Sequence, residues 1–186
     1  MSASNTLTSL TQTLKSWPII AIATISLCYL TQAVAKGFGV ELPDQANIEM
    51  VKKYLGFNRV FLILCAQVLV LMPAAEELIF RGLLFKLPRK LFDARRETGD
   101  SGEGRETSNA RPGAWTTSIA IASSALFSAA HYIAQPWPDA AFLALFFFGL
   151  AQCWLYRKTD RIWCAMLNHA LFNLTNLVLL FVQPEA

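Results

Sequence analysis

The residues best suited to chemistry in this 186-residue chain lie inside its most apolar stretches. They include both of its 2 histidines, two adjacent glutamates, an arginine and two asparagines. One acid or base at the middle of a membrane helix costs about 2.5–3.5 kcal/mol on insertion scales, so such residues persist where a function needs them or a partner neutralises them. The candidates are Glu76, Glu77, Arg81, His131, His169, Asn173 and Asn176.

Helical spacing places these candidates on three faces, because residues three, four or seven apart share one side of a helix. Glu77 and Arg81 are spaced to form an ion pair along their own helix, whereas Glu76 is turned by about 100° from Glu77. The other two faces are stripes formed by Ser124, Ser128 and His131, and by His169, Asn173 and Asn176. The least costly arrangement turns all three faces toward one shared cavity.

Such a cavity would hold the groups that a hydrolase needs to attack with activated water. A carboxylate and an imidazole that share a water act as general base and then as general acid. A second imidazole and an amide N–H are donors suited to a developing oxyanion. Each group alone could equally be a contact between helices or an interfacial anchor. A carboxylate, two imidazoles and an amide spread over three helices exceed what helix association requires.

Other intramembrane protease chemistries lack their residues in this sequence. It has no His-Glu-x-x-His zinc motif and no Gly-x-Ser-x-Gly nucleophile motif. No aspartate falls inside an apolar block, so an aspartyl dyad has no candidates. The 4 cysteines all lie in apolar blocks without Cys-x-x-Cys spacing, and we expect them to serve packing.

Membrane-spanning helices must position these residues, because the chain is too apolar for a small secreted, disordered or ordinary cytosolic protein. Apolar residues make up 54% and charged residues 16%, against about 25% charged in an average soluble domain. Mean hydropathy is +0.39, and the apolar blocks suit the roughly 20 residues that cross a bilayer. The expected spans are residues 17–35, 59–88 with a bend at Pro73 and a stop at Pro88, 114–134, 140–156 and 162–182. The expected fold is therefore all-α, a polytopic membrane bundle with candidate residues on three inward-facing helices.

The expected organisation is an N-terminal span with an outer loop over residues 1–57, followed by a core over residues 58–186. The core contains a flexible loop at 89–112. This loop and the 157–161 connection are basic, so the positive-inside rule makes both cytoplasmic and places the N-terminus inside. We expect the first span to be retained, because its apolar run is longer than that of a signal peptide. A net charge of +3 predicts no nucleic-acid face.

Three motifs, taken in order, resemble those of the CPBP family. This group comprises type II CAAX prenyl endopeptidases and bacteriocin-processing or Abi membrane proteins. The motifs are EELIFRG from Glu76, FSAAH ending at His131, and HALFN from His169 to Asn173. The likeness extends over roughly residues 70–180. It implies a multi-pass helical fold and endopeptidase activity within the membrane.

The resemblance also implies roles for individual residues. Glu76 and His131 would activate water, and His169 and Asn173 would stabilise the oxyanion. Glu77 and Arg81 match the remaining motif positions as supporting residues, and helix geometry suggests that Glu77 mainly neutralises Arg81. The family has also been treated as metal-dependent. A zinc ion held by Glu76, His131 and His169 is therefore the alternative to the cofactor-free route that we favour.

The sequence therefore predicts an intramembrane endopeptidase of the glutamate type. Its partners would be a membrane-anchored peptide or protein substrate and the lipid bilayer, with no nucleic acid. The expected location is the cell (inner) membrane of a bacterium, as an integral multi-pass protein. The alternative is a non-catalytic membrane protein that uses the same cavity to bind or sequester a peptide or partner, in an immunity-type role.

Overall fold

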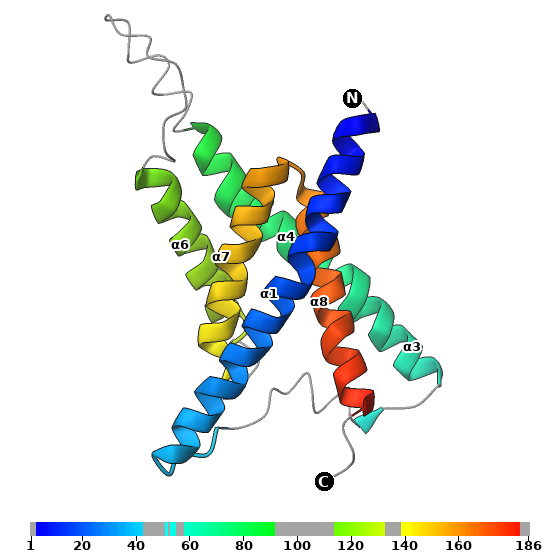
Figure 1. Ribbon diagram of the computed structural model, residues 1–186, viewed down its shortest axis with the longest axis vertical. Coiled ribbons are helices and arrows are strands. Elements are labelled where there is room, and N and C mark those ends of the chain that lie inside the picture. The colour runs from blue at the N-terminus through cyan, green and yellow to red at the C-terminus, as the bar shows by residue number, and fades with distance from the viewer. Residues whose placement is uncertain are drawn as a thin grey trace, which may run out of the picture.

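The computed structural model shows a bundle of long helices (Figure 1). It describes residues 3–42, 51, 53–54, 58–91, 114–132 and 139–182. The elements in chain order are α1 (Ala3–Gly37), α3 (Arg59–Ala66), η1 (Gln67–Leu71), α4 (Met72–Glu77), η2 (Leu78–Lys86), α6 (Ala114–Ala130), α7 (Ala141–Thr159) and α8 (Ile162–Val182). The described residues contain no strand, and the prediction of an all-α membrane bundle is confirmed.

Three of the helices are long and apolar enough to cross a membrane, over residues 5–37, 59–91 and 162–182. The outside of the bundle is apolar: Ile19 is 70% exposed and Val70 is 62% exposed. The inside holds fully buried polar side chains such as Arg81 and Glu77. This arrangement inverts that of a soluble protein and is the one that lipid requires.

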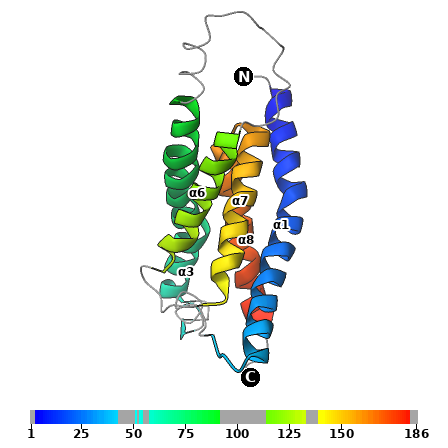
Figure 2. The same ribbon diagram turned by 90° about the vertical axis from the view of Figure 1, so that its left-hand side faces the viewer.

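The central helix is α7, which packs against α1, α6 and α8. Figure 2 shows α7 between α6 and α1. The second span, built from α3, η1, α4 and η2, lies against α6 and α8. Aromatic rings fill the core between these helices, with Phe148 in contact with both Phe127 and Phe172. The bundle therefore encloses the segment that carries the glutamates.

The second span is one continuous helix with two π-helical segments, and a proline explains where each one ends. A proline ring clashes with the carbonyl four residues before it, and widening the helix to π geometry relieves that clash. The Met72 N–H bonds Gln67 O and the Leu87 N–H bonds Gly82 O, each five residues back. Pro73 and Pro88 follow immediately.

Several predicted helix limits are wrong, including the ends of α6 at Ala130 rather than 134 and of α7 at Thr159 rather than 156. We expected Pro88 to end the second span, but the helix runs to Leu91, because the π segment η2 accommodates the ring. The first helix begins at Ala3 rather than near Trp17. Its early polar turns pack into the bundle, where the buried Thr13 hydroxyl is satisfied by donating to Ser9 O of its own helix. The prediction of α8 is confirmed at both ends.

Other predictions meet the limits of the described residues. Most of the 89–112 loop and the end of the predicted 114–134 span lie outside them, and α6 ends at Ala130. The start of α1, the end of the second span and the α7–α8 turn gather at one end of the bundle, at the top of Figures 1 and 2. The basic segments 86–90 and 157–161 belong to that end. By the positive-inside rule we predict that this end is the cytoplasmic side.

A close approach between α6 and α7 yields a prediction. A Cβ at Gly149 would lie 2.9 Å from Ser124 Cβ and 3.1 Å from Ser124 Cα, so the α6 backbone would have to shift. We expect Gly149→Ala to lower the free energy of unfolding by about 1–3 kcal/mol, measured by thermal unfolding in detergent. The matched control is Gly82→Ala, whose Cβ meets only the flexible tip of Ile162 at 3.4 Å. Equal stability of the two variants would contradict the close approach.

Candidate active site

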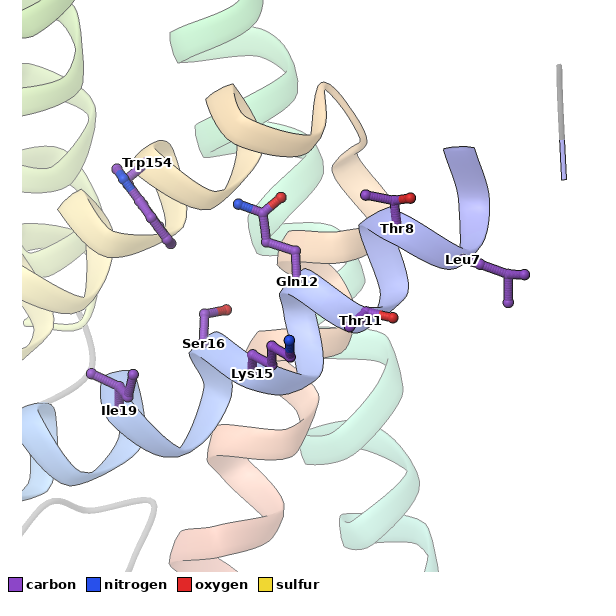
Figure 3. Close-up of a pocket in the computed structure, with 8 residues that line it drawn as sticks. All are labelled: Leu7, Thr8, Thr11, Gln12, Lys15, Ser16, Ile19 and Trp154. Carbon is purple, nitrogen blue, oxygen red and sulfur yellow. The ribbon is translucent and has the colours of Figure 1, made fainter. Parts of the chain in front are cut away.

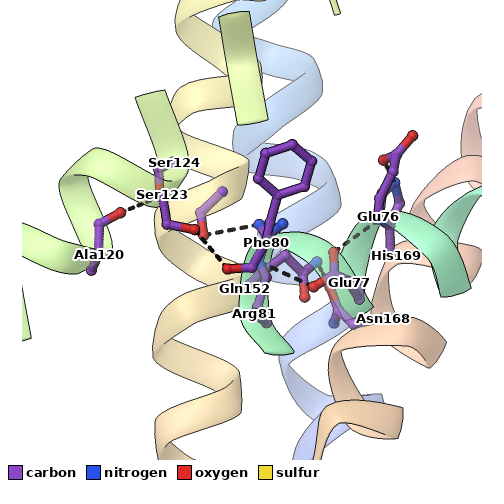
Figure 4. Close-up of polar contacts among 11 residues, drawn as sticks. Glu76, Glu77, Phe80, Arg81, Ala120, Ser123, Ser124, Gln152, Asn168 and His169 are labelled. Atoms are coloured by element: carbon purple, nitrogen blue, oxygen red, sulfur yellow. Dashed lines mark hydrogen bonds and ion pairs between the residues drawn. The ribbon is translucent and has the colours of Figure 1, made fainter. Parts of the chain in front are cut away.

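Glu77 is the centre of a buried charged cluster on the second span and α8 (Figure 4). Its Oε2 lies 3.1 Å from Arg81 Nε, which is the ion pair predicted from the sequence spacing. Its Oε1 lies 3.0 Å from His169 Nδ1. Glu77 and Arg81 have no exposed side-chain surface, and His169 is 5% exposed. Glu77 therefore bridges a cation of its own helix and an imidazole of another.

Arg81 extends the cluster to two further helices. Its Nη2 donates to the Gly149 carbonyl of α7 at 3.1 Å. Its guanidinium lies over the Phe127 ring of α6, 4.6 Å from the centroid. A cation over an aromatic face gains most where water is absent. The arginine thus has a carboxylate, a carbonyl and a ring as partners in a site that water does not solvate.

Glu76 faces a different side of the same imidazole. Its Oε2 lies 3.7 Å from His169 Nε2, and its side chain is 19% exposed. That Oε2 is buried and makes no hydrogen bond. The expected difference in direction between the adjacent glutamates is therefore present: Glu77 is locked in an ion pair, and Glu76 has a carboxylate that is partly accessible.

His131 lies one residue beyond α6, and a backbone carbonyl fixes its tautomer. Its Nδ1 lies 2.8 Å from Phe127 O. Because a carbonyl oxygen only accepts, Nδ1 must carry the proton, and in the neutral ring Nε2 then holds a free lone pair. The rings of His131 and His169 both pack on Phe127, with centroids 4.8 and 6.0 Å from it. Phe127 therefore links the two histidines.

The two asparagines of α8 have separate partners. Asn173 Nδ2 donates to Val68 O of η1 at 2.8 Å, across the interface between α8 and the second span. Asn176 Nδ2 donates to Phe172 O of its own helix at 3.0 Å. The structure thus places Asn173 beside the second span and ties Asn176 to α8.

Sequence reasoning missed a buried polar chain that joins three helices. Gln152 Nε2 of α7 donates to Asn168 Oδ1 of α8 at 3.0 Å, and Asn168 Nδ2 donates to Ser16 Oγ of α1 at 3.5 Å. All three side chains are buried. An amide within an apolar block was the available signal, and the same cost argument that selected Asn173 applies to Gln152 and Asn168. This chain ties α1 to the helices of the site.

A separate hollow lies away from the charged cluster. It is an open groove of about 560 Å³ along the N-terminal half of α1, with Trp154 of α7 on its opposite side (Figure 3). It contains none of the predicted site residues. Ser16 belongs to both the groove and the buried polar chain.

The alternative, a zinc ion held by Glu76, His131 and His169, stays a prediction. Among the residues that the structure describes, no group of three or more histidine, cysteine, aspartate or glutamate side chains is arranged to hold a metal. Glu76 and His169 are neighbours, and the Nδ1 bond of His131 to Phe127 O leaves its Nε2 lone pair available, as in histidines that bind metals. None of the four cysteines is in a disulfide, and two of them are buried.

The unequal surroundings of the two glutamates predict unequal variants. Glu77→Gln should lower the free energy of unfolding by about 3–5 kcal/mol, because it leaves Arg81 buried without its counter-charge. Glu76→Gln should unfold close to the wild-type temperature, since its carboxylate is partly exposed and its contact with His169 is long. The measurement is the thermal unfolding of both variants in detergent. The two substitutions are matched, because each replaces a glutamate by a glutamine of similar shape and removes one negative charge. Equal losses in the two variants would contradict this assignment.

The sequence that forms this site matches a family of known proteins. Residues 58–175 match the family described as Type II CAAX prenyl endopeptidase Rce1-like. No curated protein matches the chain, and no solved structure matches it. The matched segment is more than half of the 186 residues, and it contains Glu76, His131, His169 and Asn173. The chain therefore belongs to the Rce1-like type II CAAX prenyl endopeptidase family, that of CAAX-type intramembrane proteases.

Proposed function

We propose that this protein is an intramembrane endopeptidase that hydrolyses a peptide bond of a membrane-anchored substrate with activated water. The observation that carries the proposal is the pair of glutamates on the two nitrogens of His169, with Arg81 balancing the buried one. A purely structural role in helix packing would require only the Glu77–Arg81 ion pair. The additional, partly accessible carboxylate of Glu76 is the feature that hydrolysis would use.

Water activation is assigned to Glu76 together with His131. The Glu76 carboxylate accepts a proton as the water oxygen bonds to the carbonyl carbon of the substrate. The C–N bond then breaks, and the leaving nitrogen takes that proton. The Nε2 lone pair of His131, left free by the Nδ1 bond to Phe127 O, suits it to share in this transfer. Glu77, committed to Arg81 and His169, supports the site without exchanging protons with water.

Stabilisation of the oxyanion is assigned to His169 and Asn173. Glu77 Oε1 accepts from His169 Nδ1, which orients the ring within the apolar core. Donation from Nε2 to the oxyanion then uses the doubly protonated ring, because in the neutral ring this nitrogen carries a lone pair. Donors held in place in a site of low dielectric stabilise developing charge more than donors in water do. Asn173 has a second amide N–H besides the one given to Val68 O.

The substrate class follows from where the site lies. The glutamates belong to a span of residues 59–91 whose outer surface is apolar, so a scissile bond must be presented at the membrane. We therefore propose a lipid-anchored or membrane-embedded peptide, and we expect the protein to reside in the cell membrane of a bacterium. The route that we propose uses no metal ion.

Cleavage of anchored peptides tests the proposal. The wild-type protein in lipid nanodiscs should cleave members of a library of membrane-anchored peptides, presented with and without a prenylated cysteine. Glu76→Gln and His131→Phe should each lower kcat about 10²–10⁴-fold, because each removes a proton-transfer group. Asn176→Ala is the matched control, since its amide bonds only its own helix, and it should cleave at the wild-type rate. Product formation is measured by mass spectrometry.

Two results would count against the proposal. A wild-type protein that binds peptides without cleaving any, indistinguishable from Glu76→Gln, would favour the immunity-type binding protein. Chelators should leave the wild-type rate unchanged. Stoichiometric zinc that is lost together with activity would contradict the metal-free route.

A further inference from the structure

A backbone carbonyl at Val68 has lost both of its usual helical donors. In an α-helix the Met72 N–H would bond it, but this N–H is given to Gln67 O, five residues back. In a continuing π-helix the next donor would be residue 73, which is Pro73 and has no N–H. The vacated position is filled from another helix, because Asn173 Nδ2 lies 2.8 Å from Val68 O.

The replacement matters because this carbonyl belongs to a membrane span. Backbone groups in the hydrocarbon region must be satisfied within the protein, and side chains of neighbouring helices do this where a proline breaks the ladder. A side chain of another helix also bonds the second π segment, since Ser123 Oγ of α6 donates to Phe80 O at 2.8 Å, although the carbonyl there that corresponds to Val68 O is that of Leu83. The Asn173 amide therefore stands in for the missing N–H of Pro73.

The bond also joins the two helices that carry the charged cluster. Asn173 lies one helical turn beyond His169 on α8, and Val68 precedes Glu76 and Glu77 on the second span. Two hydrogen bonds thus join these helices, one from Asn173 to Val68 O and one between His169 and Glu77. On the second span, Pro73 lies between the two residues that accept these bonds.

We propose that Asn173 is a positioning residue that caps Val68 O and thereby holds the span of Glu76 and Glu77 in register with His169. This role is separate from donation to an oxyanion, for which the second amide N–H is available. The inference rests on the proposed function only in the claim that the alignment of these residues serves catalysis. The contact and its effect on the two histidines are measurable without a substrate.

Pro73→Ala supplies the test, because it restores the N–H that Asn173 replaces. Asn173→Ala should lower the melting temperature by about 2–8 °C when Pro73 is present, because it strands a carbonyl. In the Pro73→Ala background the same substitution should change it by less than about 1 °C. Asn176→Ala, which removes an amide bonded within α8, should have the same small effect in both backgrounds.

Ring signals of the 2 histidines supply a readout that overall stability does not move. In ¹⁵N-histidine-labelled protein, Asn173→Ala should shift the His169 signals, and adding Pro73→Ala should return them toward the Pro73→Ala spectrum. If Asn173→Ala fails to fold, folding of the double variant supports the proposal, and failure of both overturns it. Equal melting losses in the two backgrounds, or a His169 shift that Pro73→Ala leaves unchanged, would also overturn it. Absence of proteolysis would count only against the proposed function.

Discussion

The ion pair between Arg81 and Glu77 is the constraint on which the rest of the structure depends. Neither side chain has any exposed surface, and a charge buried in this way needs compensation from within the protein. The compensation comes from three other helices: His169 of α8, the Gly149 carbonyl of α7 and the Phe127 ring of α6. The helices that pack around the second span therefore also supply the polar and aromatic groups that contact its buried charges. Because Glu77 forms the ion pair with Arg81, the adjacent Glu76 carboxylate is not committed to that arginine.

A second constraint comes from the two prolines of that span. Each follows a π segment, and each π segment has a carbonyl that a side chain of another helix bonds. Where a proline leaves a backbone carbonyl without its helical donor, a side chain of a neighbouring helix has to donate the hydrogen bond. Asn173 supplies the missing donor at Val68 O, whereas Ser123 adds a bond from α6 to Phe80 O of the second π segment. The irregular helix and the charged cluster are parts of one arrangement.

Helical periodicity carried the sequence predictions as far as contacts within one helix. The Glu77–Arg81 pair, the divergence of Glu76 from Glu77 and both ends of α8 followed from spacing and hydropathy, because these depend on local geometry. Contacts between helices did not follow. Nothing in the spacing selects Glu77 rather than Glu76 for the closer contact with His169, or pairs Asn173 with Val68 O. The passage of the helix beyond Pro88 and the Gln152–Asn168 bond depend in the same way on neighbours that a single helix does not specify.

A double-mutant cycle on the central pair tests this account most directly. Thermal unfolding would be compared for Glu77→Gln, Arg81→Met and the two combined, in one detergent. If the buried charges exist to neutralise each other, each single variant strands its partner, and the double variant should be more stable than either. Stability losses that simply add in the double variant would show that Glu77 and Arg81 act independently. That result would contradict the claim that this pair organises the site.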